Sequence, residues 1–315
     1  MVKSPPLVTI GIPTYNRANA TLSLAIESAC NQDYPNLEII VSDNCSVDNT
    51  EEIVSSFNDE RINYIRQKIN IGANNNYNAC SNAAKGDYFL LLHDDDLIDD
   101  DFVSTCLKTA QFSTDFGFIR TGTRMITKDG ELLRDIPNPV YDNSPDVMFS
   151  TWLSGKCSFY LCSTLFNTKA LKEIGGFKSN NNLFEDGFAI IKLSAHYPIL
   201  NIVDIKASFR HHDEQRTHAA QCENWSEDFR QALDIMYLQD PAGRKELYDK
   251  GMRFFAKVSI RFARNVDNPF ARAKSMVLVG KYFPYRYWPK ETWKIAILGK
   301  ISNIIFHEKK PTLDT

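Results

Sequence analysis

The stretch DYFLLLHDDDLIDD, residues 87–100, decides the fold. Its first part, residues 87–92, is almost entirely apolar, which is typical of a central strand buried on both faces of a parallel sheet. Three carboxylates follow at once, Asp94, Asp95 and Asp96. Because ligands of open α/β sheets bind beyond the carboxyl ends of the strands, this junction predicts a central strand with a site at its end.

The residues before this stretch alternate short apolar runs with helix-like segments. Strands are expected at 7–12, 37–43 and 62–67, and helices at 18–31, 49–57 and 74–84. This alternation is typical of βαβ units and predicts an α/β fold with a mostly parallel, Rossmann-like sheet flanked by helices. Polar loops follow the strands on one edge of that sheet: PTYNR (13–17), SDNCSVDNT (42–50) and HDDD (93–96).

The second half of the chain has a less regular pattern. Its expected elements are a helix at 102–112, a hairpin at 117–127 with a turn at 128–130, a loop at 138–150, a strand at 157–168, a short helix at 169–174 and a helix at 184–196. From residue 224 onward the pattern is helical. In residues 251–264 apolar and basic side chains fall on opposite helix faces, which predicts a C-terminal helical extension.

Charge is distributed unevenly over the 315 residues, whose net charge is −3. Residues 241–315 carry 16 basic against 6 acidic residues, a net +10, which leaves −13 for residues 1–240. An acidic part with clustered carboxylates suits a divalent cation, whereas a basic part suits anionic lipid, a phosphorylated acceptor or an acidic protein.

The cellular compartment is predicted from the absence of a signal-peptide pattern, of a membrane-spanning run and of paired cysteines. Residues 1–6 lead directly into the first strand without the apolar core of a signal peptide, and no apolar run reaches the roughly 18 residues of a membrane span. Seven cysteines, an odd number without a CxxC pair, predict free thiols. A cytoplasmic protein is therefore expected.

Several acidic residues have two interpretations. Asp94 to Asp96 crowd like charges that Mg²⁺ or Mn²⁺ would relieve, or they form an acidic helix start continued by residues 99–101. Asp43 could read a base or ribose, or could belong to an Asx-turn. Glu185 and Asp186 could be catalytic acids, or could cap the helix that they begin.

A second cluster, RHH at 210–212 with His218, could complete a metal shell or hold a diphosphate. Ordinary residues of a surface loop are the alternative. The spacing does not match a zinc site.

Six blocks in this order resemble the family-2 glycosyltransferases with the GT-A fold. They cover about residues 7–218 and read IPTYNR, SDNCSVDNT, NIGANNNYNACSNAAKGDYFLLLHDDDLI, ALKEIGGF, FEDGFAIIKLS and FRHHDEQRTH. The resemblance implies a GT-A domain at 1–220, with donor binding at about 1–125 and acceptor binding at about 126–220. Residues 221–315 then form a helical, basic C-terminal region.

The resemblance also implies a nucleotide-sugar site. Its donor-binding residues would be Pro13, Thr14, Tyr15, Arg17, Asp43, Asn44, Asn70, Gly72 and Asp94, with Mn²⁺ or Mg²⁺ held by Asp95, Asp96 and His212. Two positions depart from the family pattern. Asn44 stands where a second acid is common, and His93 stands where the first acid of the commonest DxDD form aligns, so either Asp94 or Asp95 could be the principal ligand, with Asp95 favoured.

The implied reaction is an inverting transfer of a sugar from a nucleoside diphosphate, with UDP expected from family habit, to an acceptor hydroxyl. Asp186 matches the general base, with Glu185 beside it. Gly155 and Lys156 are candidates for contact with a glycan or lipid-linked acceptor, and sheet packing is the alternative. Surface polysaccharide synthesis, with the basic C-terminal region at the inner face of a membrane and no nucleic-acid partner, is the implied setting.

Two other classes compete with a transferase. A nucleotidyltransferase also places acids and a metal beside a nucleotide, but it should begin with a Gly-rich phosphate loop, and PTYNR has no glycine. A degenerate binding module would keep the fold without the chemistry. Retention of both the aspartate cluster and the Glu185–Asp186 pair favours the active enzyme.

Overall fold

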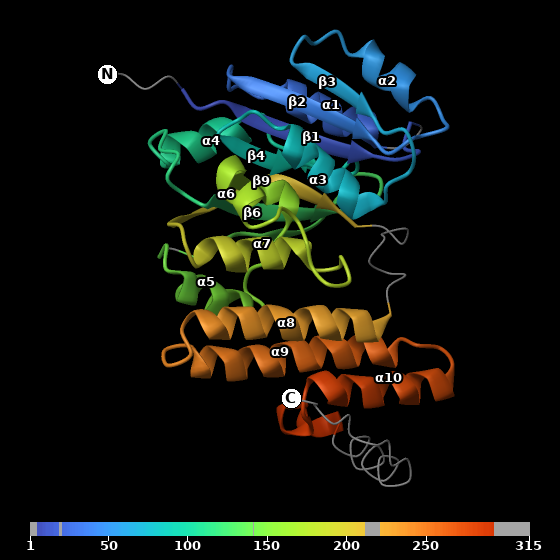
Figure 1. Ribbon diagram of the computed structural model, residues 1–315, viewed down its shortest axis with the longest axis vertical. Helices are drawn as coiled ribbons and strands as arrows, with labels where there is room; N and C mark the ends of the chain where they lie inside the picture. Colours follow the sequence, from blue (N-terminus) through green and yellow to red (C-terminus); the bar gives the residue numbers. More distant parts are fainter. Residues whose placement is uncertain (1–4, 19–20, 141, 212–220, 293–315) are drawn as a thin grey trace, which may run out of the picture. The chain divides into compact units, whose positions relative to one another are not determined.

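The computed structural model describes residues 5–18, 21–140, 142–211 and 221–292. The chain divides into two compact units, one within residues 1–218 and one within residues 219–315. The strands and helices run in the order shown by the colours of Figure 1.

The described part of the first unit contains nine strands in one sheet. They are β1 Val8–Thr14, β2 Leu37–Asp43, β3 Ile62–Arg66, β4 Tyr88–Leu91, β5 Leu97–Ile98, β6 Phe118–Ile126, β7 Leu132–Ile136, β8 Thr164–Asn167 and β9 Ile199–Arg210. The helices of this unit are α1 Leu22–Cys30, α2 Thr50–Ser56, α3 Ala73–Ala83, α4 Phe102–Thr109, α5 Pro145–Trp152, α6 Thr168–Glu173 and α7 Glu185–Ser194.

The sheet has the order β3-β2-β1-β4-β8-β6-β9-β5, and β7 pairs with β6. Strands β3, β2, β1 and β4 are parallel neighbours, as the alternating pattern of the first 92 residues predicts. Beyond β4 the sheet is mixed, because β8 is antiparallel to both β4 and β6 whereas β9 is parallel to β6. The α/β fold class is confirmed.

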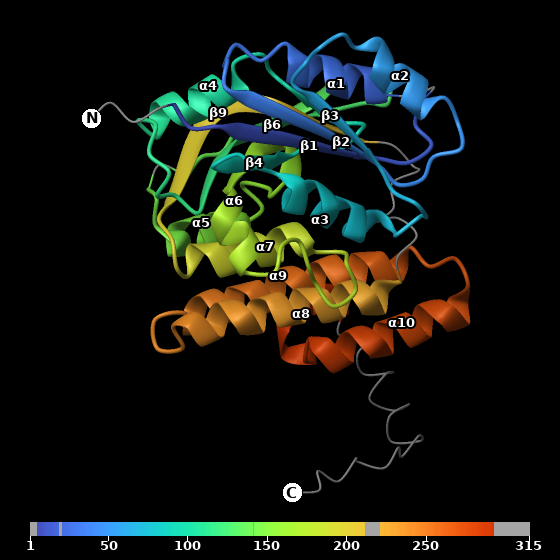
Figure 2. The same cartoon turned by 45° about the horizontal axis from the view of Figure 1, so that its top comes forward.

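Helices cover both faces of the parallel part of the sheet. Figure 2 shows α1 and α2 on one face and α3 on the other. Strand β1 explains the division, because Ile10 and Ile12 join the core cluster that includes Leu22 and Ile26 of α1. Gly11 points to the opposite face, where a Cβ would lie 2.7 Å from the Phe89 ring of β4 and 2.8 Å from Cys80 Cβ of α3. The missing side chain therefore lets α3 approach the strand.

Two expected elements differ from the structure. The predicted loop at 138–150 contains the start of α5, because Ser144 precedes a proline at the first helical position, where no amide donor is needed. The predicted strand at 157–168 is confined to β8, preceded by the 3₁₀ turn η1 Leu161–Ser163. The Tyr160 carbonyl accepts bonds from the hydroxyls of Ser163 and Thr164, and these local bonds replace a sheet ladder.

The second unit is helical in its described part, as predicted from residue 224 onward. It contains α8 Cys222–Gln239, α9 Lys245–Arg264, α10 Pro269–Tyr282 and the short turns η3 Tyr285–Tyr287 and η4 Lys290–Thr292. Aromatic contacts join the helices, including a stacked pair between Phe229 and Phe255 with ring centroids 4.4 Å apart. Within the described residues, no helix is both long enough and apolar enough to span a bilayer.

Replacing Gly11 with alanine should destabilise the protein by about 2 kcal/mol, because the added methyl overpacks the contact between β1 and α3. Urea unfolding followed by circular dichroism measures this change. In the Phe89→Leu background the cost should shrink by about 1 kcal/mol, because the smaller side chain makes room. Strictly additive effects of the two substitutions would contradict this account.

Candidate active site

The carboxyl ends of three parallel strands bring polar residues to one sheet edge. Thr14 at the end of β1 pairs in register with Asp43 at the end of β2, and Asp43 pairs with Arg66 at the end of β3. The amide of Asn44 donates to the Thr14 carbonyl at 2.9 Å, so the pairing continues into the loops. Backbone geometry thus places the predicted donor residues of β1 and β2 side by side.

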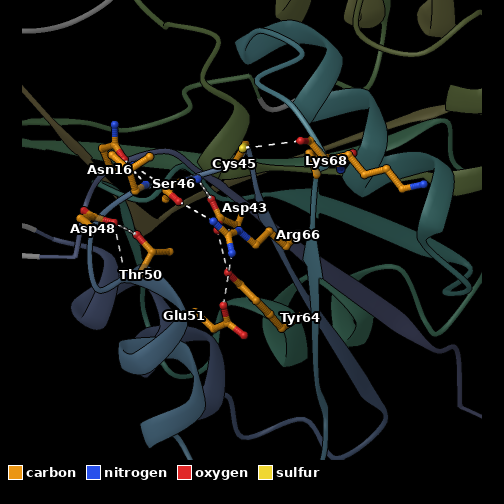
Figure 3. Close-up of polar contacts among 12 residues, drawn as sticks. Asn16, Asp43, Cys45, Ser46, Asp48, Thr50, Glu51, Tyr64, Arg66 and Lys68 are labelled. Atoms are coloured by element: carbon orange, nitrogen blue, oxygen red, sulfur yellow. Dashed lines mark hydrogen bonds and ion pairs between the residues drawn. The ribbon is translucent and has the colours of Figure 1, made fainter.

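Asp43 is 1% exposed and is held by several partners (Figure 3). Its Oδ1 accepts from the Ser46 amide at 2.8 Å, and its Oδ2 accepts from the Tyr64 hydroxyl at 2.6 Å. The Arg66 guanidinium lies 3.6 Å from Oδ2. The carboxylate is therefore fixed in orientation at the sheet edge.

The loops after β1 and β2 brace each other. Asn16 adopts a left-handed conformation with φ of 53°, its amide donates to the Ser46 hydroxyl, and its side-chain oxygen accepts from the Val47 amide. The Ala18 amide donates to Asp48, which also accepts from Thr50. The conformation of the first loop, which contains Tyr15 and Arg17 and follows Pro13 and Thr14 of β1, therefore depends on the second loop.

Asn44, which stands where the family often has a second acid, fixes the loop at residues 70–72. Its Nδ2 donates to Asn70 Oδ1 at 2.9 Å, and its Oδ1 accepts from the Ile71 amide at 2.8 Å. Asn70 Oδ1 also accepts from the Gly72 amide. An aspartate could not donate the first of these bonds. Gly72 starts α3 with φ of +82°, a conformation that glycine adopts readily.

The acid loop, defined as residues 93–96, follows β4 and concentrates charge. Burial, with the neighbouring Asp95, raises the pKa of Asp94 to about 6, although Thr14 and Arg17 oppose the shift. Burial also raises the pKa of Asp96, against the influence of His93. For His93, burial favours the neutral form, but the adjacent carboxylates outweigh it and raise the pKa to about 8.

Arg210, the last residue of β9, clamps the acid loop. Its amide donates to Asp96 Oδ1 at 3.0 Å, and its Nε donates to the Asp95 carbonyl at 2.8 Å. Its Nη1 donates to the carbonyls of Thr127 and Lys128 in the β6–β7 turn. The side chain is buried, so the described contacts give Arg210 a supporting role rather than that of a loop residue reaching into solvent.

The residues of the acid loop fit a divalent cation. His93, Asp95 and Asp96 each offer a ligand atom, and these atoms lie within 4.8 Å of one another. Among the described residues, His93 Nε2 and Asp96 Oδ2 are buried without a hydrogen-bond partner, although Asp96 Oδ2 lies 3.5 Å from His93 Nδ1. Imidazole and carboxylate donors suit Mn²⁺, and carboxylates suit Mg²⁺. Unsatisfied donor atoms in a carboxylate-rich loop are what a cation would complete.

Asp186 lies in the first turn of α7, beside the buried Glu185. Burial, reinforced by Glu185, raises the pKa of Asp186 to about 7, and His93 acts in the opposite direction. Phe184 caps the helix start and stacks on Trp152 of α5 with ring centroids 5.6 Å apart.

The remaining predicted residues are less closely tied to this site. Gly155 and Lys156 follow α5, where Gly155 takes φ of +71° and the Lys156 amide bonds the Thr151 carbonyl, an arrangement that ends the helix. The Trp152–Phe184 stack connects that helix end to the head of α7. His212 and His218 lie outside the described residues.

Sequence reasoning missed three contributors to this site, His93, Tyr64 and Arg66, and it did not predict the supporting role of Arg210. His93 was noted only as a departure from the acidic pattern, although its position beside three aspartates signals a ligand. Tyr64 and Arg66 stand at the end of a predicted strand, where polar residues on the ligand edge are informative. The clamp made by Arg210 had no sequence signal, because it depends on pairing between β6 and β9.

The comparisons with known proteins agree with this geometry. The pattern of glycosyl transferase family 2 matches residues 9–172, and the chain belongs to this family. A curated relative from Campylobacter jejuni, GalNAc(5)-diNAcBac-PP-undecaprenol beta-1,3-glucosyltransferase, is 32% identical over 157 residues, which cover 49% of this chain and 49% of the relative. The match thus spans about half the length of that relative.

Solved structures share the fold. TarS residues 1–349 from S. aureus, in complex with UDP-GlcNAc, superposes with a TM-score of 0.68 at 18% identity, covering 89% of this chain and 82% of that one. The mannosyltransferase PcManGT from Pyrobaculum calidifontis, in complex with GDP-Man and Mn²⁺, gives 0.56 at 17% identity, covering 96% and 88%. The chain has the GT-A fold of these glycosyltransferases.

Replacing Arg210 with methionine should lower the free energy of unfolding by about 2–3 kcal/mol, because the carbonyls of Asp95, Thr127 and Lys128 lose their charged donor. Amide hydrogen exchange in residues 93–98 and 127–130 should accelerate. Arg124→Met is the matched control, since its partly exposed pair with Asp99 contributes at most about 1 kcal/mol. Equal acceleration of both segments in the control would refute the clamp.

Proposed function

We propose that this protein is a metal-dependent, inverting glycosyltransferase that moves a sugar from a nucleoside diphosphate to an acceptor hydroxyl. The observation that carries the proposal is that two groups of acids have different environments. Asp186, with a pKa near 7, suits a proton acceptor, and the acid loop suits a cation and a diphosphate. Membership of glycosyl transferase family 2 supports this reading.

Residues 1–125 would bind the donor. In this proposal the Asp43 carboxylate binds the nucleobase and Asp94 binds the ribose. The side chains of Asn44 and Asn70, with Gly72, fix the loop that precedes α3 next to the nucleotide. Pro13, Thr14, Tyr15 and Arg17 would line the nucleotide from β1, where Tyr15 is 44% exposed and available for stacking. UDP is the proposed nucleotide, and the structural relative TarS was solved with UDP-GlcNAc.

His93, Asp95 and Asp96 would hold Mn²⁺ or Mg²⁺ in this proposal, with His212 as a further candidate ligand. A bound cation would stabilise the charge that develops on the departing diphosphate. The buried donor atoms of His93 and Asp96 support the assignment. The structural relative PcManGT was solved with Mn²⁺.

Asp186 would take the proton from the acceptor hydroxyl as that oxygen attacks the anomeric carbon. Bond formation and departure of the diphosphate occur on opposite faces of the sugar, so the anomeric configuration inverts and no covalent sugar-enzyme intermediate forms. Glu185 contributes by raising the pKa of Asp186, which strengthens it as a base near neutral pH.

The proposed acceptor is a lipid-linked saccharide, bound by residues 126–220 with Gly155 and Lys156 near its entrance. The name of the Campylobacter jejuni relative specifies a diphosphoundecaprenol substrate, which supports this class. The setting would be surface glycan synthesis in the cytoplasm, at the inner face of the membrane. The basic region at 221–315 would hold the enzyme there.

Isothermal titration with UDP and Mn²⁺, together with transfer assays from UDP-sugars, tests the assignment of roles. Asp186→Asn should reduce kcat about 10³-fold and leave UDP binding within about twofold. Asp95→Ala should weaken metal-dependent UDP binding about 10- to 100-fold and impair transfer as well. NMR of the product should show inverted configuration.

Asp100→Asn is the matched control for these variants, because it removes an exposed acid from the neighbouring aspartate run. It should change neither binding nor transfer. Loss of UDP binding in Asp186→Asn equal to that in Asp95→Ala would contradict the separate roles. Absence of UDP, GDP and dTDP binding to the unmodified protein would defeat the donor-site proposal.

The transfer rate should depend on pH through Asp186. Because its pKa is raised to about 7, the proton-accepting carboxylate predominates above pH 7, and kcat/KM should fall about tenfold per pH unit below it. Initial rates between about pH 5.5 and 8.5 measure this profile. A flat profile, or the same profile in the residual activity of Asp186→Asn, would exclude Asp186 as the titrating base.

A further inference from the structure

Helix α9 carries a continuous basic face. Arg253, Lys257, Arg261 and Arg264 recur at intervals of four, four and three residues, so they lie on one side of the helix, and all four are exposed. The opposite face is buried in the helical unit and includes Met252, Phe255, Ser259 and Ala263. The burial pattern therefore separates an internal apolar face from an external cationic one.

The positive charge on this face is not neutralised locally. Among residues 221–292, none of the four cations forms an ion pair with a carboxylate. Other basic residues of the same unit do so, since Arg230 bonds Asp234 at 3.0 Å and Lys281 lies 3.9 Å from Glu223. The face thus presents cations available to an external anion.

An exposed aromatic side chain follows this face in the chain, at the start of the next helix. Phe270, in the first turn of α10, is 87% exposed. The turn that presents it is fixed, because Arg272 donates to the carbonyls of Val266 and Asp267, and the Asn268 side chain caps the helix. Both views show the two helices joined at this corner (Figures 1 and 2). Phe270 therefore projects from an ordered corner.

The exposed side of α10 continues the same chemistry. Phe270, Lys274, Val277 and Lys281 are spaced by four, three and four residues, which places them on one helix face. Phe270, Lys274 and Lys281 are exposed, and Val277 is half-buried. Of the two lysines, Lys281 is paired with Glu223, so Lys274 is the cation that this face adds. This side of α10 thus combines an exposed cation, Lys274, with the exposed ring of Phe270.

We infer that the basic α9 face and Phe270 form a docking surface for anionic phospholipid. The cations would contact lipid phosphates, and Phe270 would enter the headgroup region. The choice of a membrane as occupant rests on the proposed function, because a lipid-linked acceptor lies in a bilayer. A protein partner would bury Phe270 in an apolar pocket without requiring anionic lipid, and a nucleic acid would compete for the cations alone.

Vesicle flotation with the full chain tests the docking surface. The protein should float with phosphatidylcholine vesicles that contain phosphatidylglycerol and remain unbound with phosphatidylcholine alone. The triple variant Arg253→Gln, Lys257→Gln, Arg261→Gln should bind about 100-fold more weakly, since each cation near an anionic surface contributes roughly a fivefold factor. Raised salt should weaken wild-type binding.

Two further variants test whether the location of the charges matters and whether the apolar ring of Phe270 contributes to binding. Lys85→Gln, Lys108→Gln, Lys169→Gln removes three exposed charges from the first unit and should bind like the wild type. Phe270→Ser keeps the net charge and should weaken binding about tenfold, because an apolar ring no longer enters the interface. Unchanged binding of the α9 triple variant, or equal loss in the first-unit variant, overturns the inference.

A competing polyuridylate strand identifies a nucleic-acid surface. Displacement of the protein from vesicles by this strand, with strand binding lost in the α9 variant, would also overturn the inference. Transfer to a water-soluble acceptor, measured without vesicles, should be unaffected by the α9 and Phe270 variants. If the protein transfers sugar to the soluble acceptor but does not bind vesicles, the docking surface is wrong and the proposed function stands. If it binds vesicles but no nucleotide, the proposed function is wrong and the docking surface stands.

Discussion

The crowding of carboxylates at the end of β4 is the constraint on which the site depends. Asp94 and Asp96 both have raised pKa values, chiefly because burial disfavours their charged forms. The surrounding structure offsets part of that cost with His93, Arg17 and the backbone amide of Arg210. Much of the second half of the sheet serves to deliver these partners, because β9 must run parallel to β6 before its last residue reaches the acid loop.

Environment divides the acids into two kinds. The acid loop contains closely spaced groups whose mutual repulsion a cation would relieve, and two of its donor atoms are buried without hydrogen-bond partners among the described residues. Asp186 has one acidic neighbour and a pKa near 7, so it can exchange a proton near neutral pH. Similar carboxylates are thereby suited to different chemistry by burial and neighbouring charge alone.

Much of the first half of the fold could be predicted from local sequence. Apolar runs at regular spacing, each followed by a helix-like segment, predict β1 to β4 in parallel, and these strands do pair in parallel. Their order in the sheet was not predicted. The loops that hold Asp43, Asp94 and Asp186 were likewise found from strand ends and from a helix start. The predicted start of the strand at 157–168 was wrong, because the hydroxyls of Ser163 and Thr164 donate to the Tyr160 carbonyl before β8.

The sequence by itself determined the α/β class, the family and the candidate acids of the site, because periodicity and motif spacing are local properties. Only the tertiary structure decided which atoms meet. The clamp made by Arg210 joins residues 114 and 115 positions apart in the chain, and the role of Asn44 depends on a loop 26 residues away. Such contacts are set by long-range strand pairing and packing, which no local pattern encodes.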